Sequence, residues 1–144
     1  MPDIRKVDDS ISVSPQIQPA DIAAIKAAGF VAVVNNRPDN EQEGQPAGEA
    51  IRAAAESAGL GYAAIPIGHA GFSHPQVTAM VDVLEGADGP VFAFCRSATP
   101  SCNLWALARA RMGDPPQELI EKGADAGYDL NGLRPLLDQL AAQA

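Results

Sequence analysis

Short apolar runs alternate with amphipathic segments along the chain, and glycine or proline separates them. Residues 11–14 alternate apolar and polar side chains, as a half-buried strand does. Residues 30–35 form a continuous β-branched run, which is typical of a strand buried on both faces of a parallel sheet. Residues 62–67 and 91–94 predict two more strands, and the second of them is as apolar as a buried central strand.

Helical periodicity fills the segments between these strands. Pro19 opens one helix that stops at Gly29, residues 48–57 form a second, and Ser73 caps a third. The alternation of strands and helices predicts right-handed crossovers and a mostly parallel sheet. We therefore expect one α/β domain over residues 1–144, with three layers and helices on both faces of the sheet. Helical periodicity also covers the end of the chain, at residues 104–112, 116–126 and 133–142.

Composition and charge narrow the range of partners. The 144 residues are 47% hydrophobic, which suffices for one buried core. Asp and Glu outnumber Lys and Arg by 18 to 10, so the formal charge of −8 disfavours nucleic acid and anionic membranes as partners. No apolar run reaches the roughly 18 residues that a membrane span needs, and no secretory leader is recognisable. We expect a soluble cytoplasmic protein.

The cysteines and histidines do not suggest a metal site. Cys95 and Cys102 are too few and too close together for a disulfide framework. His69 and His74 do not join them in a spacing that binds zinc. We therefore predict neither a metal nor a cofactor.

The segment at residues 95–101 is the first candidate site, because parallel sheets bind ligands beyond the carboxyl ends of their strands. It follows the strand at 91–94 and leads into a helix, so backbone N–H groups and the positive helix end converge on it. That environment suits an anion and stabilises a thiolate, so Cys95 is the candidate nucleophile and is expected to be partly exposed. In the alternative interpretation, Cys95 is a small apolar residue that ends a buried strand. The predicted anion-binding residues of this loop are Arg96, Ser97, Ala98, Thr99 and Ser101.

The polar loop at residues 36–46 leaves another strand at the same edge of the sheet and is the second candidate. Arg37 is a candidate for additional positive charge on the anion, or else a solvated loop residue. Phosphoryl transfer needs an acid to protonate the leaving oxygen, and Asp39 is the best-placed carboxylate. The alternatives are that Asp39 is only surface charge, or that His69, in a loop without carboxylates, is the acid.

Six segments in this order and spacing resemble one bacterial family, the phosphatase-like domain of beta-lactamase-hydrolase-like proteins. The resemblance runs from about Ile11 to Leu137. It implies a fold similar to that of the dual-specificity cysteine phosphatases, and some members of the family are labelled sulfurtransferases. The segments are Val-Val-Asn-Asn-Arg-Pro-Asp at 33–39, Gly-Gln-Pro at 44–46, Ala-Gly-Leu at 58–60, Ile-Pro-Ile at 65–67, Phe-Cys-Arg-Ser at 94–97 with Leu-Trp-Ala-Leu-Ala at 104–108, and Ala-Gly-Tyr-Asp-Leu at 126–130.

The chain departs from the family in the cysteine loop itself. Members typically read Cys-Arg-Ser-Gly-Thr-Arg-Ser, whereas here Ala98 replaces the glycine and Pro100 replaces the arginine. A cysteine phosphatase spacing would place the arginine at Ser101, and a rhodanese spacing would place it at Pro100. The loop therefore lacks the bidentate guanidinium that stabilises transition-state charge. Alanine at position 98 is also costly if the loop needs a positive φ there.

Three functions stay open at this point. The first is a phosphatase-like hydrolase in which Cys95 attacks a phosphomonoester. The second is a rhodanese-like sulfurtransferase that carries a persulfide on Cys95, and the third is a catalytically impaired anion-binding domain. Each takes a small anionic ligand, either a phosphomonoester or a sulfur species, and the sequence specifies neither its identity nor the oligomeric state.

Overall fold

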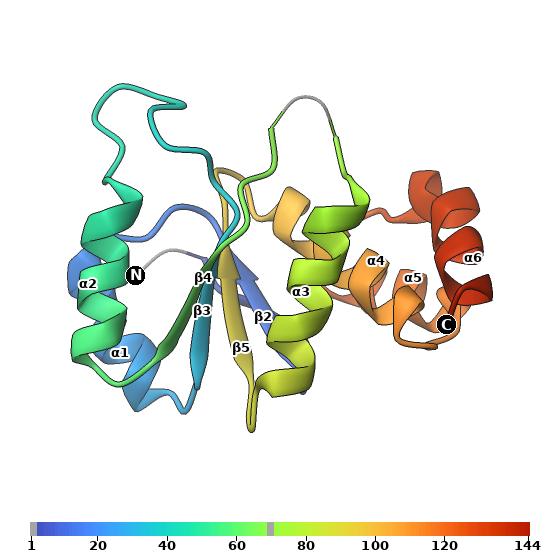
Figure 1. Ribbon diagram of the computed structural model, residues 1–144, viewed down its shortest axis with the longest axis horizontal. Coiled ribbons are helices and arrows are strands. Elements are labelled where there is room, and N and C mark those ends of the chain that lie inside the picture. Colours follow the sequence, from blue (N-terminus) through green and yellow to red (C-terminus); the bar gives the residue numbers. More distant parts are fainter. Residues whose placement is uncertain (1–2, 69–70) are drawn as a thin grey trace.

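The computed structural model describes residues 3–68 and 71–144. These residues form a five-stranded sheet with helices on both faces (Figure 1). The predicted α/β class and mostly parallel sheet are confirmed, because four neighbouring strands are parallel and the first strand pairs antiparallel at one edge. In spatial order the strands are β1 (Arg5–Asp8), β2 (Ile11–Ser14), β5 (Val91–Phe94), β3 (Ala32–Asn35) and β4 (Gly61–Ala64).

The helices divide between the two faces of the sheet. The face toward α1 and α2 carries Phe92 and Phe94 of β5, whereas Val91 and Ala93 belong to the larger core on the other face. Within the described ranges, none of the helices has the length and apolar character to cross a bilayer. One face carries η1 (Pro19–Asp21), α1 (Ile22–Ala27) and α2 (Gly48–Ser57), and the other carries α3 (His74–Gly86) and α4 (Thr99–Arg111). Helices α5 (Pro116–Asp125) and α6 (Arg134–Ala142) pack against α4, and η2 (Asn131–Leu133) contacts α6.

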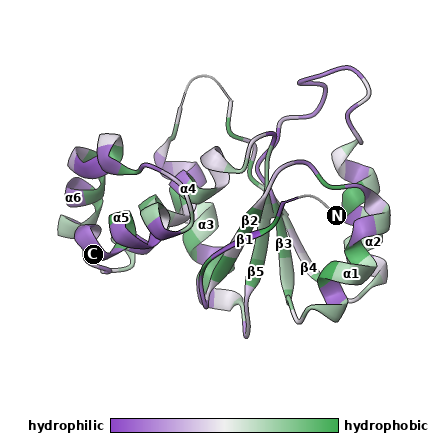
Figure 2. Ribbon diagram, turned by 180° about the vertical axis from the view of Figure 1, so that it is seen from behind, coloured by the Kyte–Doolittle hydropathy of each residue, from purple (hydrophilic) through white to green (hydrophobic). Residues whose placement is uncertain are grey.

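Hydropathy follows this layering. The strands are mostly apolar, whereas the outer parts of α5 and α6 and the loop before α2 are largely hydrophilic (Figure 2). All four residues of β5 are buried, because this strand has a neighbour on each side and helices on both faces. Its continuous apolar run is therefore explained by its central place in the sheet.

The largest differences from the sequence-based expectation are at β1, β4 and α4. Strand β1 was not predicted, because Val7 is its one buried residue and its other side chains are polar. Strand β4 ends at Ala64, three residues before the predicted end. Helix α4 begins at Thr99 instead of residue 104, because Pro100 fits the first turn of a helix, where its missing N–H is not needed.

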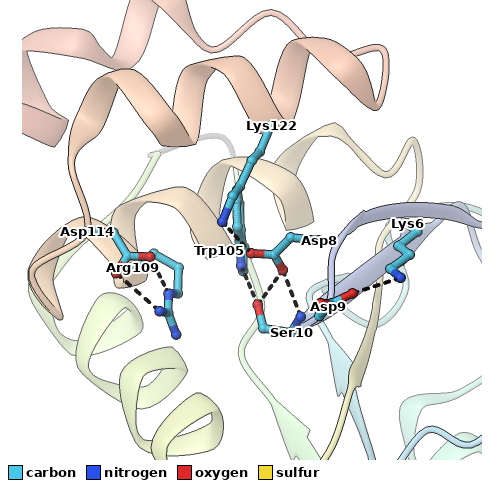
Figure 3. A network of polar contacts seen from close by, with 8 residues as sticks. All are labelled: Lys6, Asp8, Asp9, Ser10, Trp105, Arg109, Asp114 and Lys122. Carbon is cyan, nitrogen blue, oxygen red and sulfur yellow. Dashed lines mark hydrogen bonds and ion pairs between the residues drawn. The ribbon is translucent and has the colours of Figure 1, made fainter.

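A polar network at the amino end of the sheet connects the turn between β1 and β2 to two helices (Figure 3). The Asp8 carboxylate accepts hydrogen bonds from the Ser10 N–H (2.8 Å) and hydroxyl (2.6 Å) and from Lys122 Nζ of α5 (3.0 Å). Trp105 of α4 donates its indole N–H to the Ser10 hydroxyl at 3.2 Å. Burial alone would raise the pKa of Asp8, but the hydrogen bonds from Ser10 and Lys122 outweigh burial and lower it below its ordinary value.

We expect Asp8→Asn to lower the free energy of unfolding by about 1–2 kcal/mol at pH 7, since the charge-assisted hydrogen bonds are lost. A carboxyl group with a lowered folded-state pKa stabilises the fold above its unfolded value of about 3.9, and this contribution disappears as the pH falls through the folded-state value. Urea unfolding of both proteins at pH 7 and near pH 3 measures the difference. Asp9→Asn is the control, because Asp9 is fully exposed and should show no comparable loss. A penalty that persists unchanged at low pH would contradict the charge-based explanation.

Candidate active site

Cys95 lies at the point where β5 leaves the sheet. Its N–H donates to the Ser14 carbonyl of β2 at 3.2 Å, and the Asn36 N–H beyond β3 donates to the preceding Phe94 carbonyl at 2.8 Å. Both neighbouring strands thus hold the end of β5. Only 2% of the surface of Cys95 is exposed, so the prediction of a partly exposed thiol is wrong. The backbone of Cys95 still hydrogen bonds to β2, as the strand residues before it do, so its side chain is buried like theirs.

The loop after Cys95 makes a single sharp turn into α4. Arg96 and Ser97 are exposed, and Ser97 forms an isolated bridge with Pro15 at the end of β2. Ala98 is 1% exposed and has a φ of 71°, in the left-handed region that favours glycine. The positive φ that makes alanine unfavourable at this position, as expected from the sequence, is therefore present in the structure.

Helix α4 directs its amino end at this loop. Pro100 has no N–H, so the first turn can offer an anion the N–H groups of Thr99 and Ser101 only. The Ser101 hydroxyl is completely buried, and within the described part of the chain it has no hydrogen-bond partner. A buried hydroxyl without a hydrogen-bond partner destabilises the fold. The Ser101 hydroxyl is therefore a candidate donor to a ligand in this loop.

Arg37 is placed differently from the open anion ligand that the sequence suggested. Its side chain is 4% exposed, and its Nε pairs with Glu41 at 2.8 Å. Its two terminal nitrogens donate to the side-chain oxygens of Gln16 (3.0 Å) and Gln42 (3.1 Å). The guanidinium therefore braces the loop after β3 against the segment after β2, and Glu41 neutralises its charge.

Asp39 also has a structural contact that the sequence did not predict. Its Oδ1 accepts the N–H of Gly48, the first residue of α2, at 2.8 Å. Asp39 lines a polar pocket of about 200 Å³ that also includes Glu49 and Tyr62. Burial raises the pKa of Tyr62, and Asn35 Nδ2 donates to its hydroxyl oxygen at 3.1 Å. His69, the alternative acid, lies outside the described residues.

Sequence reasoning missed Asn36. Its side-chain Nδ2 donates to the Ile65 carbonyl at 2.9 Å, and its own carbonyl accepts the Ile67 N–H at 2.9 Å. Together with its bond to Phe94, these contacts join the ends of β5, β3 and β4 around the candidate site. An amide side chain that ends a strongly apolar run was the one available signal.

Cys102 is part of the core. Burial, with a smaller contribution from the charge of Cys95, raises the pKa of Cys102 to about 12. It therefore stays a thiol at neutral pH, and Cys95 is the candidate nucleophile of the pair. In the part of the chain that the structure describes, no three His, Cys, Asp or Glu side chains gather in an arrangement for a metal ion.

Comparison with known proteins agrees with this geometry. Residues 3–112 match the family described as beta-lactamase hydrolase-like protein, phosphatase-like domain. The chain belongs to this family. A beta-lactamase hydrolase-like protein of Agrobacterium fabrum is 30% identical over 138 residues, which is 95% of this chain and 32% of that protein. The chain thus spans about a third of the length of the curated relatives it matches.

Solved structures of phosphatases share the fold. A candidate phosphatase from Neisseria meningitidis is 33% identical, with a TM-score of 0.79 over 95% of this chain and 97% of that one. PTPMT1 in complex with PI(5)P is 12% identical, with a TM-score of 0.73 and 97% of each chain covered. The expected similarity to cysteine phosphatases is therefore confirmed at the level of the fold.

Ala98→Gly tests whether the loop stores backbone strain. Glycine relieves a left-handed cost of about 1–2 kcal/mol but adds unfolded-state entropy, so we expect the free energy of unfolding to stay level or rise by up to about 1 kcal/mol. The matched control is Ala110→Gly, a buried alanine inside α4, which should lose about 1 kcal/mol or more. Urea unfolding measures both. Equal losses in the two variants would show that Ala98 is not strained.

Proposed function

We propose that this chain is a slow cysteine-dependent phosphatase-like hydrolase that acts on phosphomonoesters. The observation that carries the proposal is the position of Cys95, between the buried strand β5 and the amino end of α4, with Ala98 turning the chain in between. Family membership and the shared fold support the same chemistry. PTPMT1, whose complex holds PI(5)P, is an example of this fold binding a phosphate monoester.

In this proposal the Cys95 thiolate attacks phosphorus. The S–P bond forms as the ester P–O bond breaks, and the leaving oxygen takes up a proton. Water then attacks the cysteinyl phosphate, which releases inorganic phosphate and regenerates the thiolate. The N–H groups of the loop and of the first turn of α4 hold the phosphoryl oxygens, and the Ser101 hydroxyl, which has no partner among the described residues, is a further donor for the anion.

The missing arginine makes the proposed reaction slow. Removing one donor that stabilises transition-state charge typically costs about 10²–10³ in rate. Arg96 is exposed and forms no ion pair among the described residues, so it is the cation we assign to the outer phosphoryl oxygens. It starts from the outer side of the loop and replaces the bidentate contact only in part.

Proton delivery to the leaving group is also weak in this proposal. Asp39 holds the first turn of α2, and the loop at residues 68–73 contains no carboxylate. We therefore propose that the substrates of this chain are activated esters, because their leaving groups are weak bases and need little protonation.

Restoring the family residues tests the proposed reaction. Hydrolysis of 4-nitrophenyl phosphate should be slow in the natural chain, and Ala98→Gly with Pro100→Arg should raise kcat/KM at least about tenfold above either single change. The two changes are coupled, because the arginine needs a relaxed loop to reach the phosphate. The same double variant with Cys95→Ser is the control and should be inactive. A double variant no faster than the natural chain would contradict phosphoryl transfer, and sulfur transfer from thiosulfate to Cys95 would replace it with the sulfurtransferase function.

Substitution of Asp39 separates a structural role from an acid role. Asparagine keeps an oxygen for the Gly48 N–H, so Asp39→Asn should leave turnover of aryl and alkyl phosphates within about twofold of the natural chain. Asp39→Ala removes the acceptor and should cost about 1 kcal/mol of stability. Kinetics on both substrates and urea unfolding check this. A selective loss of at least about tenfold on the alkyl ester in Asp39→Asn would establish Asp39 as the general acid.

A further inference from the structure

The outer edge of β4 has unpaired backbone groups. The N–H groups of Gly61 and Ile65 donate toward β3, to Val31 (3.0 Å) and Asn35 (2.9 Å). Because alternate residues of a parallel strand direct their backbone groups to opposite sides, Tyr62 and Ala64 direct theirs away from β3. Among the described strands β3 is the one neighbour of β4, so these groups face solvent.

This edge lacks the protection that the opposite edge has. The register of β1 with β2 shifts between Lys6 and Asp8, and charged side chains line the strand. In contrast, β4 pairs with β3 in unbroken register and consists of Gly, Tyr, Ala and Ala. Proteins usually protect a free edge with a very short strand, charge, proline or a bulge. Strand β4 is short, but it has no charge, proline or bulge along its described residues.

An apolar groove of about 290 Å³ runs beside this edge, between β4 and the carboxyl-terminal part of α3. Half-buried Ala32 and Ala63 form its floor, and Val83 and Ala87 form its wall. Gly61 places the groove near the amino ends of the strands, whereas the Cys95 loop follows their carboxyl ends. The groove is therefore separate from the proposed active site, and its small side chains leave space for a larger side chain from outside.

The charge beside the groove indicates which kind of partner it can bind. Asp82 and Asp88 are exposed, line the groove and form no ion pair within the described ranges. A second copy of this chain would bring the same carboxylates against each other, and each copy carries a net charge of −8. Lysine or arginine beside an apolar side chain complements both the carboxylates and the groove.

We propose that the β4 edge and this groove bind an extended basic segment of a partner protein by strand addition. The segment pairs with the free backbone groups of Tyr62 and Ala64 and places one apolar side chain in the groove. The basic side chains two residues before and after it lie on the same face of the added strand and contact Asp82 and Asp88. Because β4 is only four residues long, the contact is small and the association is transient.

The probe is a fluorescein-labelled peptide of sequence Lys-Thr-Val-Thr-Lys, in which the lysines lie on the same face as the valine. It is compared with the peptide Glu-Thr-Val-Thr-Glu. Anisotropy should rise with the lysine peptide alone, and amide chemical shifts should move in residues 61–65 and 82–88. Asp82→Asn with Asp88→Asn should weaken binding about five- to tenfold. The matched control changes exposed acids of α5, Glu118→Gln with Asp125→Asn, and should bind as the natural chain does.

Backbone pairing is tested separately with Ala64→Pro, which removes an outward N–H without breaking a bond to β3. Binding should fall at least about tenfold, with circular dichroism and the urea midpoint unchanged. If that variant does not fold, Ala87→Gln fills the groove from α3 and should give the same loss. Equal binding of both peptides, shifts outside the two segments, or peptide-independent dimers in sedimentation would each overturn the proposal.

Discussion

The end of β5 fixes the position of Cys95, the proposed nucleophile. Val91 pairs with Ile11 on one side and with Ala32 on the other, and the register holds along all four residues. Strands β2, β5 and β3 therefore end at the same level, and the segments that follow them leave the same edge of the sheet (Figure 1). Cys95 lies at this edge, directly after β5. A central strand that is hydrogen bonded on both sides and buried on both faces cannot shift along its axis, so the thiol position is set by the sheet.

The packing of α4 allows the unfavourable conformation of the loop. Most of this helix is buried, and Trp105 anchors it to Ser10 at the far end of the sheet. The position of the first turn of α4 is therefore fixed by the end of β5, which precedes it, and by the burial of the rest of the helix. The chain turns from β5 into α4 within residues 95–98, and Ala98 adopts a positive φ in this turn.

The sequence predicted elements where a single pattern dominated, and it failed where distant contacts decided. The apolar runs of β3 and β5 could be predicted, since burial alone requires those residues. The cysteine loop could be predicted because its polar residues follow a buried strand and precede a helical pattern. Strand β1 could not, because Arg5 stabilises it by donating to the Ala126 carbonyl across the molecule. Likewise, no local pattern shows that Arg37 meets Gln16 or that Asp39 meets Gly48. Asp39 and Arg37 lie at the predicted edge of the sheet, but their hydrogen-bond partners belong to other segments that only folding brings close.

The loss of the loop arginine changes what this site can do with an anion. Backbone N–H groups at the start of α4 attract a phosphate dianion in its ground state as well as in the transition state, so they provide affinity without much acceleration. A guanidinium that grips two equatorial oxygens binds the transition state better, and this difference is what raises kcat. With Pro100 in place of that residue, the first turn has lost both the guanidinium and one N–H group. In the proposed function, a site built in this way binds small anions better than it turns them over.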